Sequence, residues 1–223
     1  MTTDPNRRIK ICGLSEPETL RAALGAGADM VGLVFFAPSP RAVTLERAAE
    51  LAAIVRASGD AEIVALSVDA DDALLEAINE AAAPDLHQLH GAESLARVAE
   101  VAARFGPVMK ALPVRAGADV VAAEAYAAVG AAILFDAPPP PESVLPGGNG
   151  EAFDWTRLDG AGVPFLLSGG LTPANAGAAM RVPGAIGIDV SSGVERARGV
   201  KDAGLIRDFI QAARAAEPES LIA

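Results

Sequence analysis

The sequence predicts an α/β protein folded as a single-domain (β/α)8 TIM barrel, and two patterns along the chain support that fold. Short runs rich in β-branched and other apolar residues recur eight times, about 25 residues apart, the length of one strand, one helix and two short loops. The segments between these runs place apolar residues on one helical face. Strands that alternate with helices form a parallel sheet, and a count of eight favours the closed barrel over the open, doubly wound sheet.

The expected strands begin near residue 8 and continue almost to the end of the chain. They cover residues 9–12, 30–35, 63–68, 86–89, 108–111, 132–135, 165–168 and 185–189. Helical periodicity is clearest in residues 45–55, 74–82 and 205–213. Expected helix starts are Ser15 (with Glu18 three residues on, as in a capping box), Thr44, Thr172 and Asp202.

One stretch breaks the regular spacing. Residues 137–150 hold too many prolines and glycines for a helix, so they form either a linker between domains or a long loop. The 73 residues that follow contain only two expected strands, too few for an independent core. We therefore expect one barrel domain over residues 1–223, with 137–150 as a substrate loop and a frayed tail from about residue 215.

Composition and charge exclude several classes of protein. The 223 residues are 51% apolar and 21% charged, a balance typical of a folded domain and not of a disordered chain. The longest apolar stretch is too short to span a membrane, and we expect no signal peptide. A single cysteine fits a reducing, cytoplasmic compartment. The net charge of −11, with no basic run, argues against nucleic acid as a partner, but not against a small phosphorylated ligand.

Active sites of such barrels lie at the carboxyl ends of the strands, where this chain carries reactive and charged groups. Read in order, these are Cys12, Arg41, Asp69, His90, Asp136, Ser168 and Asp189. Cys12 is either a small buried apolar residue or, at the end of a strand, a general base. Asp136 is either a loop or helix cap or a general acid, and as an acid it needs a raised pKa. A thiol base and a carboxylic acid across a barrel mouth suit proton transfer at a sugar carbon.

Two further patterns concern ligands. His87 and His90 are three residues apart on a strand, so they face opposite sides and do not form a metal site. Glycine-rich turns at residues 168–175 and 189–193 follow the seventh and eighth strands, where barrel enzymes commonly bind phosphate. The sequence therefore predicts a phosphate site in these turns and no metal.

Ordered motifs run through almost the whole chain, from residue 9 to 202. They are Lys10-Ile-Cys-Gly13, Gly27-Ala-Asp-Met-Val-Gly32 with Phe35-Phe36, Ser39-Pro-Arg41, Gln88-Leu-His-Gly91, Phe135-Asp-Ala137, Gly147-Gly-Asn-Gly150 with Phe153-Asp-Trp155, Ser168-Gly-Gly-Leu171 with Asn175, and Gly187-Ile-Asp-Val-Ser-Ser-Gly-Val-Glu195 with Gly199-Val-Lys-Asp202. In these motifs the sequence resembles the phosphoribosylanthranilate isomerases of tryptophan biosynthesis. The third strand and residues Asn149 and Glu151 depart from the usual pattern.

The resemblance implies an Amadori rearrangement without metal or organic cofactor. In that interpretation Asp136 is the general acid at the ribose ring oxygen and Cys12 the general base at ribose C2. Arg41 would meet the anthranilate carboxylate, and substrate contacts would also come from Lys10, His90 and Asp189. The phosphate would be held by Gly169, Gly170, Ser191, Ser192 and Gly193. The partner is a small molecule, and the protein is a monomer or a homodimer.

Three alternatives remain at this stage. A related barrel isomerase of histidine biosynthesis performs the same rearrangement. That family is marked by a pair of aspartates, one at the end of the first strand, where this chain has Cys12. A thiol hydrolase would use Cys12, His90 and Asp136. A non-catalytic barrel that binds a sugar phosphate would keep the glycine turns without turnover.

Overall fold

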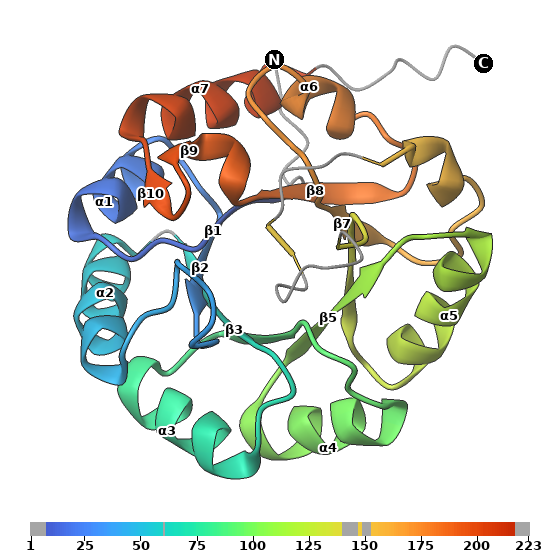
Figure 1. The fold of residues 1–223 in the computed structure, drawn as a ribbon, viewed down its shortest axis with the longest axis horizontal. Helices are drawn as coiled ribbons and strands as arrows, with labels where there is room; N and C mark the ends of the chain where they lie inside the picture. Colours follow the sequence, from blue (N-terminus) through green and yellow to red (C-terminus); the bar gives the residue numbers. More distant parts are fainter. Residues whose placement is uncertain (1–7, 60, 140–146, 149–152, 217–223) are drawn as a thin grey trace.

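The computed structural model describes residues 8–59, 61–139, 147–148 and 153–216, and it confirms the closed parallel barrel. Eight strands hydrogen-bond in sequence order, and β1 pairs with β8 to close the ring. Figure 1 looks into this ring, with the helices arranged around its outside. The strands are β1 (Arg8–Cys12), β2 (Met30–Val34), β3 (Glu62–Ser67), β4 (Leu86–Leu89), β5 (Val108–Pro113), β6 (Ala132–Asp136), β7 (Phe165–Leu167) and β8 (Ala185–Val190).

The helices that cover the barrel are less regular than its strands. They are α1 (Pro17–Gly25), α2 (Leu45–Ser58), α3 (Asp72–Ala82), α4 (Leu95–Phe105), α5 (Gly117–Ala128), α6 (Ala176–Ala179) and α7 (Ala203–Arg214). In the described part of the segment between β6 and β7, only a 3-10 turn, η1 (Trp155–Leu158), stands where a helix is expected. After β8 come a second 3-10 turn, η2 (Ser192–Val194), and a hairpin of β9 (Glu195–Ala197) and β10 (Val200–Lys201).

The expected helix starts are right at two positions and wrong at two. Thr44 and Asp202 cap α2 and α7 by accepting hydrogen bonds from backbone amides of the first turn. Helix α1 instead begins at Pro17, whose missing N–H suits a first helical position, and Ser15 does not cap it. Helix α6 begins at Ala176, because Asn175 Oδ1 accepts the amide of Thr172 and closes a turn before the helix.

The alternation of strand side chains separates two apolar regions. Outward-facing residues such as Ile9 and Ile11 belong to the main core between barrel and helices. Inward-facing residues of β2, β3, β5, β6 and β7 form a smaller cluster inside the barrel: Met30, Val64, Met109, Ala111, Leu134 and Leu166. These apolar side chains fill the part of the barrel interior nearer the amino ends of the strands. Polar residues further along the same strands therefore lie closer to the mouth of the barrel.

The prediction for residues 137–150 lies largely outside the described residues, which include only 137–139 and 147–148 of that segment. The same holds for most of the predicted tail. No helix in the described part of the chain is long and apolar enough to cross a membrane.

Candidate active site

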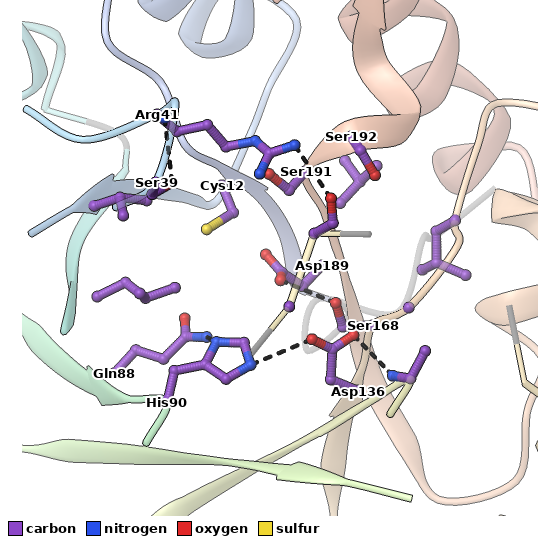
Figure 2. A pocket seen from close by; sticks show the side chains of 18 of the residues that line it. Cys12, Ser39, Arg41, Gln88, His90, Asp136, Ser168, Asp189, Ser191 and Ser192 are labelled. Carbon is purple, nitrogen blue, oxygen red and sulfur yellow. Dashed lines mark hydrogen bonds and ion pairs between the residues drawn. The ribbon is translucent and has the colours of Figure 1, made fainter. Parts of the chain in front are cut away.

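A cavity of about 790 Å³, including its open mouth, lies at the carboxyl ends of the strands. All the residues that the family resemblance assigns to the site, except Lys10, line it, and Figure 2 shows the polar ones. The described wall consists of Cys12, Val34, Phe36, Ser39, Arg41, Leu66, Val68, Gln88, His90, Asp136, Ala137, Pro138, Gly147, Gly148, Ser168, Gly169, Gly170, Leu171, Asp189, Val190, Ser191, Ser192 and Gly193.

Cys12 is the last residue of β1 and directs its thiol into this cavity (Figure 2). Its neighbour in β2 is Gly32, and a Cβ there would stand 2.9 Å from the Cys12 sulfur. Glycine at that position therefore leaves room for the thiol. Burial raises the pKa of Cys12, and the positive charge of Lys10 offsets part of this effect. The raised pKa makes the thiolate scarcer at neutral pH but a stronger base.

Lys10 lies below the cavity wall. It precedes Cys12 by two residues on the same strand, so both point into the barrel, and its side chain is fully buried. The Lys10 ammonium donates to Oδ1 of Asp189 at 2.8 Å, and the Ser168 hydroxyl donates to Oδ2 at 3.2 Å. Burial alone would lower the pKa of Lys10, but the charges of Asp189 and Cys12 outweigh it and the pKa is raised. Direct substrate contact by Lys10 stays a prediction.

Asp136 ends β6 and is held by two groups. Its Oδ1 accepts the backbone amide of Ala137 at 2.8 Å, and its Oδ2 lies 3.3 Å from Nε2 of His90 (Figure 2). The other ring nitrogen of His90 lies 3.4 Å from Nε2 of Gln88. The Gln88 carbonyl oxygen is buried and has no partner in the described part of the molecule. His90 thus aligns the Asp136 carboxyl toward the cavity, and no hydrogen bond among the described residues joins His90 to Cys12.

Arg41 reaches the cavity from the loop after β2, paired with a carboxylate that the sequence did not single out. Its Nε and Nη2 donate to the two carboxylate oxygens of Glu195 at 2.7 and 3.1 Å, and Nη2 also donates to the Gly148 carbonyl at 3.3 Å. Glu195 accepts from Lys201 at 2.9 Å as well. Burial opposes ionisation of Glu195, but the hydrogen bond from Arg41 and the charge of Lys201 prevail and lower its pKa to about 2.

The predicted phosphate-binding turns face each other at one side of the mouth. The backbone amides of Gly169, Gly170, Ser192 and Gly193 donate to no other described residue, so they are free for an anion. The two turns approach so closely that a Cβ on Gly193 would stand 1.7 Å from the carbonyl oxygen of Leu171. The Lys201 ammonium donates to the carbonyl and hydroxyl of Ser191 at 2.8 and 3.3 Å, which holds the second turn in place.

His87, within β4, and Asp69, after the end of β3, lie away from the cavity. His87 points outward and its Nε2 lies 2.8 Å from Oδ1 of Asn79, so the two histidines of β4 and its end face different sides as predicted. Asp69 accepts the amide of Ala92 and braces neighbouring loops. Within the described ranges, no cluster of three or more histidine, cysteine, aspartate or glutamate side chains could hold a metal ion.

Sequence reasoning missed Glu195, Lys201 and Gln88 as site residues. Glu195 and Gln88 lie inside motifs that carry the family resemblance, which was the available signal for them. Lys201 stands on the hairpin after η2, and its proximity to Ser191 depends on how that hairpin folds back. Lys201 also lies in one of those motifs, Gly199-Val-Lys-Asp202, but the motif does not indicate the contact with Ser191.

These features define the class: a (β/α)8-barrel enzyme whose mouth joins a thiol, a carboxyl group and a pair of turns with unpartnered backbone amides. Comparisons with known proteins are more specific. The sequence model of the family described as N-(5′-phosphoribosyl)anthranilate (PRA) isomerase matches residues 9–212. The N-(5′-phosphoribosyl)anthranilate isomerase of Nitrobacter hamburgensis is 58% identical over 94% of this chain and 93% of its own. That of a Bradyrhizobium species is 56% identical over 96% and 98%.

Solved structures agree with the sequence comparisons. The phosphoribosyl anthranilate isomerase of Thermotoga maritima is 32% identical, with a TM-score of 0.80 over 93% of this chain and 98% of its own. Another, in complex with reduced 1-(o-carboxyphenylamino)-1-deoxyribulose 5-phosphate, is 30% identical, with a TM-score of 0.77 and the same coverage. The chain belongs to the N-(5′-phosphoribosyl)anthranilate isomerase family.

Proposed function

We propose that the chain converts N-(5′-phosphoribosyl)anthranilate into 1-(2-carboxyphenylamino)-1-deoxyribulose 5-phosphate, with Asp136 as general acid and Cys12 as general base. The observation that carries this proposal is the meeting of these two groups in one cavity beside unpartnered backbone amides. Family membership supports the reaction, and the geometry supports the roles of the residues.

The first step needs an acid at the ribose ring oxygen. Protonation by Asp136 breaks the bond between C1 and the ring oxygen, while the anilino nitrogen supplies its electron pair to C1. The product is an open-chain, protonated Schiff base. The contact between Asp136 and His90 orients the carboxyl group for this transfer.

The second step needs a base at ribose C2. The Cys12 thiolate takes the C2 proton, and the electrons of the C–H bond neutralise the Schiff base to give an enolamine. Loss of the O2 proton and protonation of C1 then yield the ketone, and one proton passes from Cys12 back to Asp136 to reset the site. The positive charge of the Schiff base favours the thiolate form of Cys12 when it is needed.

The two ends of the substrate carry negative charge, and the cavity offers a partner to each. The Arg41 guanidinium suits the anthranilate carboxylate. The free amides of Gly169, Gly170, Ser192 and Gly193 suit the phosphate. His90 and Asp189 line the same cavity and complete the set of substrate contacts.

We also infer that the protein acts in the cytoplasm and binds a small molecule rather than nucleic acid. A base that is the only cysteine of the chain works only while it stays reduced, as it does in that compartment. The charge of −11 opposes contact with a nucleic-acid backbone. Whether the protein is a monomer or a homodimer is decided by light scattering on the purified chain.

The test is a fluorescence time course with substrate generated in place from anthranilate and phosphoribosyl pyrophosphate. We expect wild-type protein to accelerate the loss of the substrate signal, and Cys12→Ser to lose most of that acceleration because a hydroxyl is a far weaker base at neutral pH. Unchanged turnover in Cys12→Ser would remove the assigned base. No acceleration by folded wild type would leave a sugar-phosphate binder as the better account.

A further inference from the structure

Three charged side chains form a buried cluster, the Arg41–Glu195–Lys201 cluster, in which Arg41 lines the cavity and the other two lie behind it. The exposed fractions of these side chains are 5%, 4% and 2%. Glu195 accepts two hydrogen bonds from Arg41, one from Lys201 and one from the amide of Gly199 at 2.9 Å. Glu195 is not part of the cavity wall, whereas Arg41 is, so Glu195 reaches a carboxylate in the cavity through Arg41.

The Arg41 side chain lies in a slot that fits one conformation. A Cβ on Gly13 would stand 2.6 Å from its Cδ, and a Cβ on Gly148 would stand 2.7 Å from its Nη1. Both glycines have positive φ angles, +76° and +71°, which favour glycine independently of space. The carboxylate of Glu195 closes the slot by binding Nε and Nη2 together, a bidentate geometry that fixes the plane of the guanidinium.

The slot leaves one end of the guanidinium available. Nη1 of Arg41 donates to none of the described residues, while Nε and Nη2 are engaged. With Arg41 and Lys201 positive and Glu195 negative, the cluster carries a net charge of +1 beside the cavity. It therefore presents a fixed donor and a positive charge to an anionic group.

We propose that Glu195 is a positioning residue that sets the specificity of the site for a carboxylate, by holding Arg41 with Nη1 directed to that group. This inference rests on the proposed function and deepens it. Lys201 also donates to the carbonyl and hydroxyl oxygens of Ser191, and these hydrogen bonds do not involve Glu195, so the turn assigned to phosphate keeps them when Glu195 is replaced.

Glu195 has two physical effects on the affinity for a carboxylate, neutralising positive charge and positioning Arg41, and their signs are opposite. One substitution therefore distinguishes them. If Glu195 served only to neutralise charge, its replacement by glutamine would raise the net charge from +1 to +2 and tighten the binding of a carboxylate. If it positions Arg41, the same replacement frees the guanidinium to rotate and weakens that binding, because the side chain must be ordered again for every ligand.

The experiment compares two stable probes in wild type and Glu195→Gln. One probe is reduced 1-(2-carboxyphenylamino)-1-deoxyribulose 5-phosphate, and the other is the matching compound without the carboxyl group. We expect the inhibition constant of the first to rise about 10- to 100-fold, the range of one charge-assisted hydrogen bond, and that of the second to change little. The KM for substrate should rise with it, while kcat changes much less.

Controls separate this result from general damage. Glu195→Asp keeps the charge and should restore part of the loss, and it is measured in place of Glu195→Gln if the latter does not fold. Glu62→Gln removes an exposed partner of Arg8 at the start of β3, far from the mouth, and should leave both constants unchanged.

Tighter binding of the carboxylated probe, or equal weakening of both probes, would overturn the positioning role. Failure of wild type to isomerise substrate and to prefer the carboxylated probe would instead overturn the proposed function itself.

Discussion

Lys10 and Asp189 form an ion pair inside the barrel, with the ammonium 2.8 Å from Oδ1, directly below the layer that holds Cys12. Both side chains are buried, so the pair is shielded from solvent and acts on the thiol at short range. The positive charge of Lys10 lowers the pKa of Cys12 and the negative charge of Asp189 raises it. The pair is therefore a means of setting the strength of Cys12 as the proposed base.

The first prediction concerns this pair. Lys10→Met should raise the pKa of Cys12 further, because the larger of the two positive charges that oppose burial and Asp189 is then lost and only that of Lys201 remains. Asp189→Asn should lower it. The measurement is the rate of Cys12 alkylation by iodoacetamide against pH, which is unambiguous because the chain has one cysteine.

Loss of one partner from a buried pair costs on the order of 3–5 kcal/mol, so Lys10→Met must first be shown to be folded. The double variant Lys10→Met/Asp189→Asn leaves no unpaired charge and provides a more stable reference. Alkylation midpoints that coincide in all variants would show that the pair has no influence on the thiol.

The second prediction concerns Asp136, the proposed general acid. Asp136→Asn should lower kcat by about 10²- to 10⁴-fold, the usual worth of acid catalysis, because an amide cannot protonate the ring oxygen. The affinity for the reduced product analogue should be nearly intact, since the anion-binding groups are untouched. A parallel loss of affinity and rate would instead assign Asp136 a structural role.

The barrel itself was predictable because each strand is a local apolar run and each interval is long enough for one helix. All eight expected strands occur, most with ends shifted by one or two residues. The segment between β6 and β7 and the short α6 were less predictable, since their turns depend on particular side chains such as Asn175. The start of α1 was equally hard to predict from Ser15, because the helix begins at Pro17.

The candidate site divides in the same way. Cys12, His90, Asp136 and Asp189 follow from the rule that strand ends meet at the barrel mouth. The bond between Arg41 and Glu195 joins residues 154 positions apart, and no periodicity reports such a contact. The position of Lys10 could not be predicted for another reason. Its motif indicates a site residue but not how far the side chain lies from the cavity, and two residues before Cys12 on the same strand place it one layer deeper in the barrel.

The third prediction follows from the low pKa of Glu195. A carboxyl group whose pKa falls to about 2 in the folded protein contributes stability above its unfolded pKa and loses it as the pH falls toward 2. The contribution is about 3 kcal/mol when fully present. The free energy of unfolding should therefore decrease between pH 5 and pH 2, and the decrease should be about 3 kcal/mol larger in wild type than in Glu195→Gln.

Urea unfolding at several pH values measures this difference directly. Other carboxyl groups also titrate in the same window, but they are common to both proteins and cancel in the comparison. Parallel curves for the two proteins would mean that Glu195 is not stabilised by its cationic partners in the folded state.

The fourth prediction concerns the close approach of the two turns proposed to bind phosphate. A methyl group on residue 193 would stand 1.7 Å from the carbonyl oxygen of Leu171, so Gly193→Ala must push the turns apart. We expect a loss of about 1–3 kcal/mol in the free energy of unfolding, the usual cost of overpacking. We also expect weaker inhibition by inorganic phosphate, because the free amides of the two turns no longer converge on one anion.

Gly25→Ala is the matched control: Gly25 is exposed at the end of α1, and its Cβ would meet nothing within 4 Å. That change should leave phosphate inhibition unaltered and stabilise the helix by roughly 0.5–1 kcal/mol. Phosphate inhibition that survives Gly193→Ala as well as it survives Gly25→Ala would place the phosphate elsewhere in the cavity.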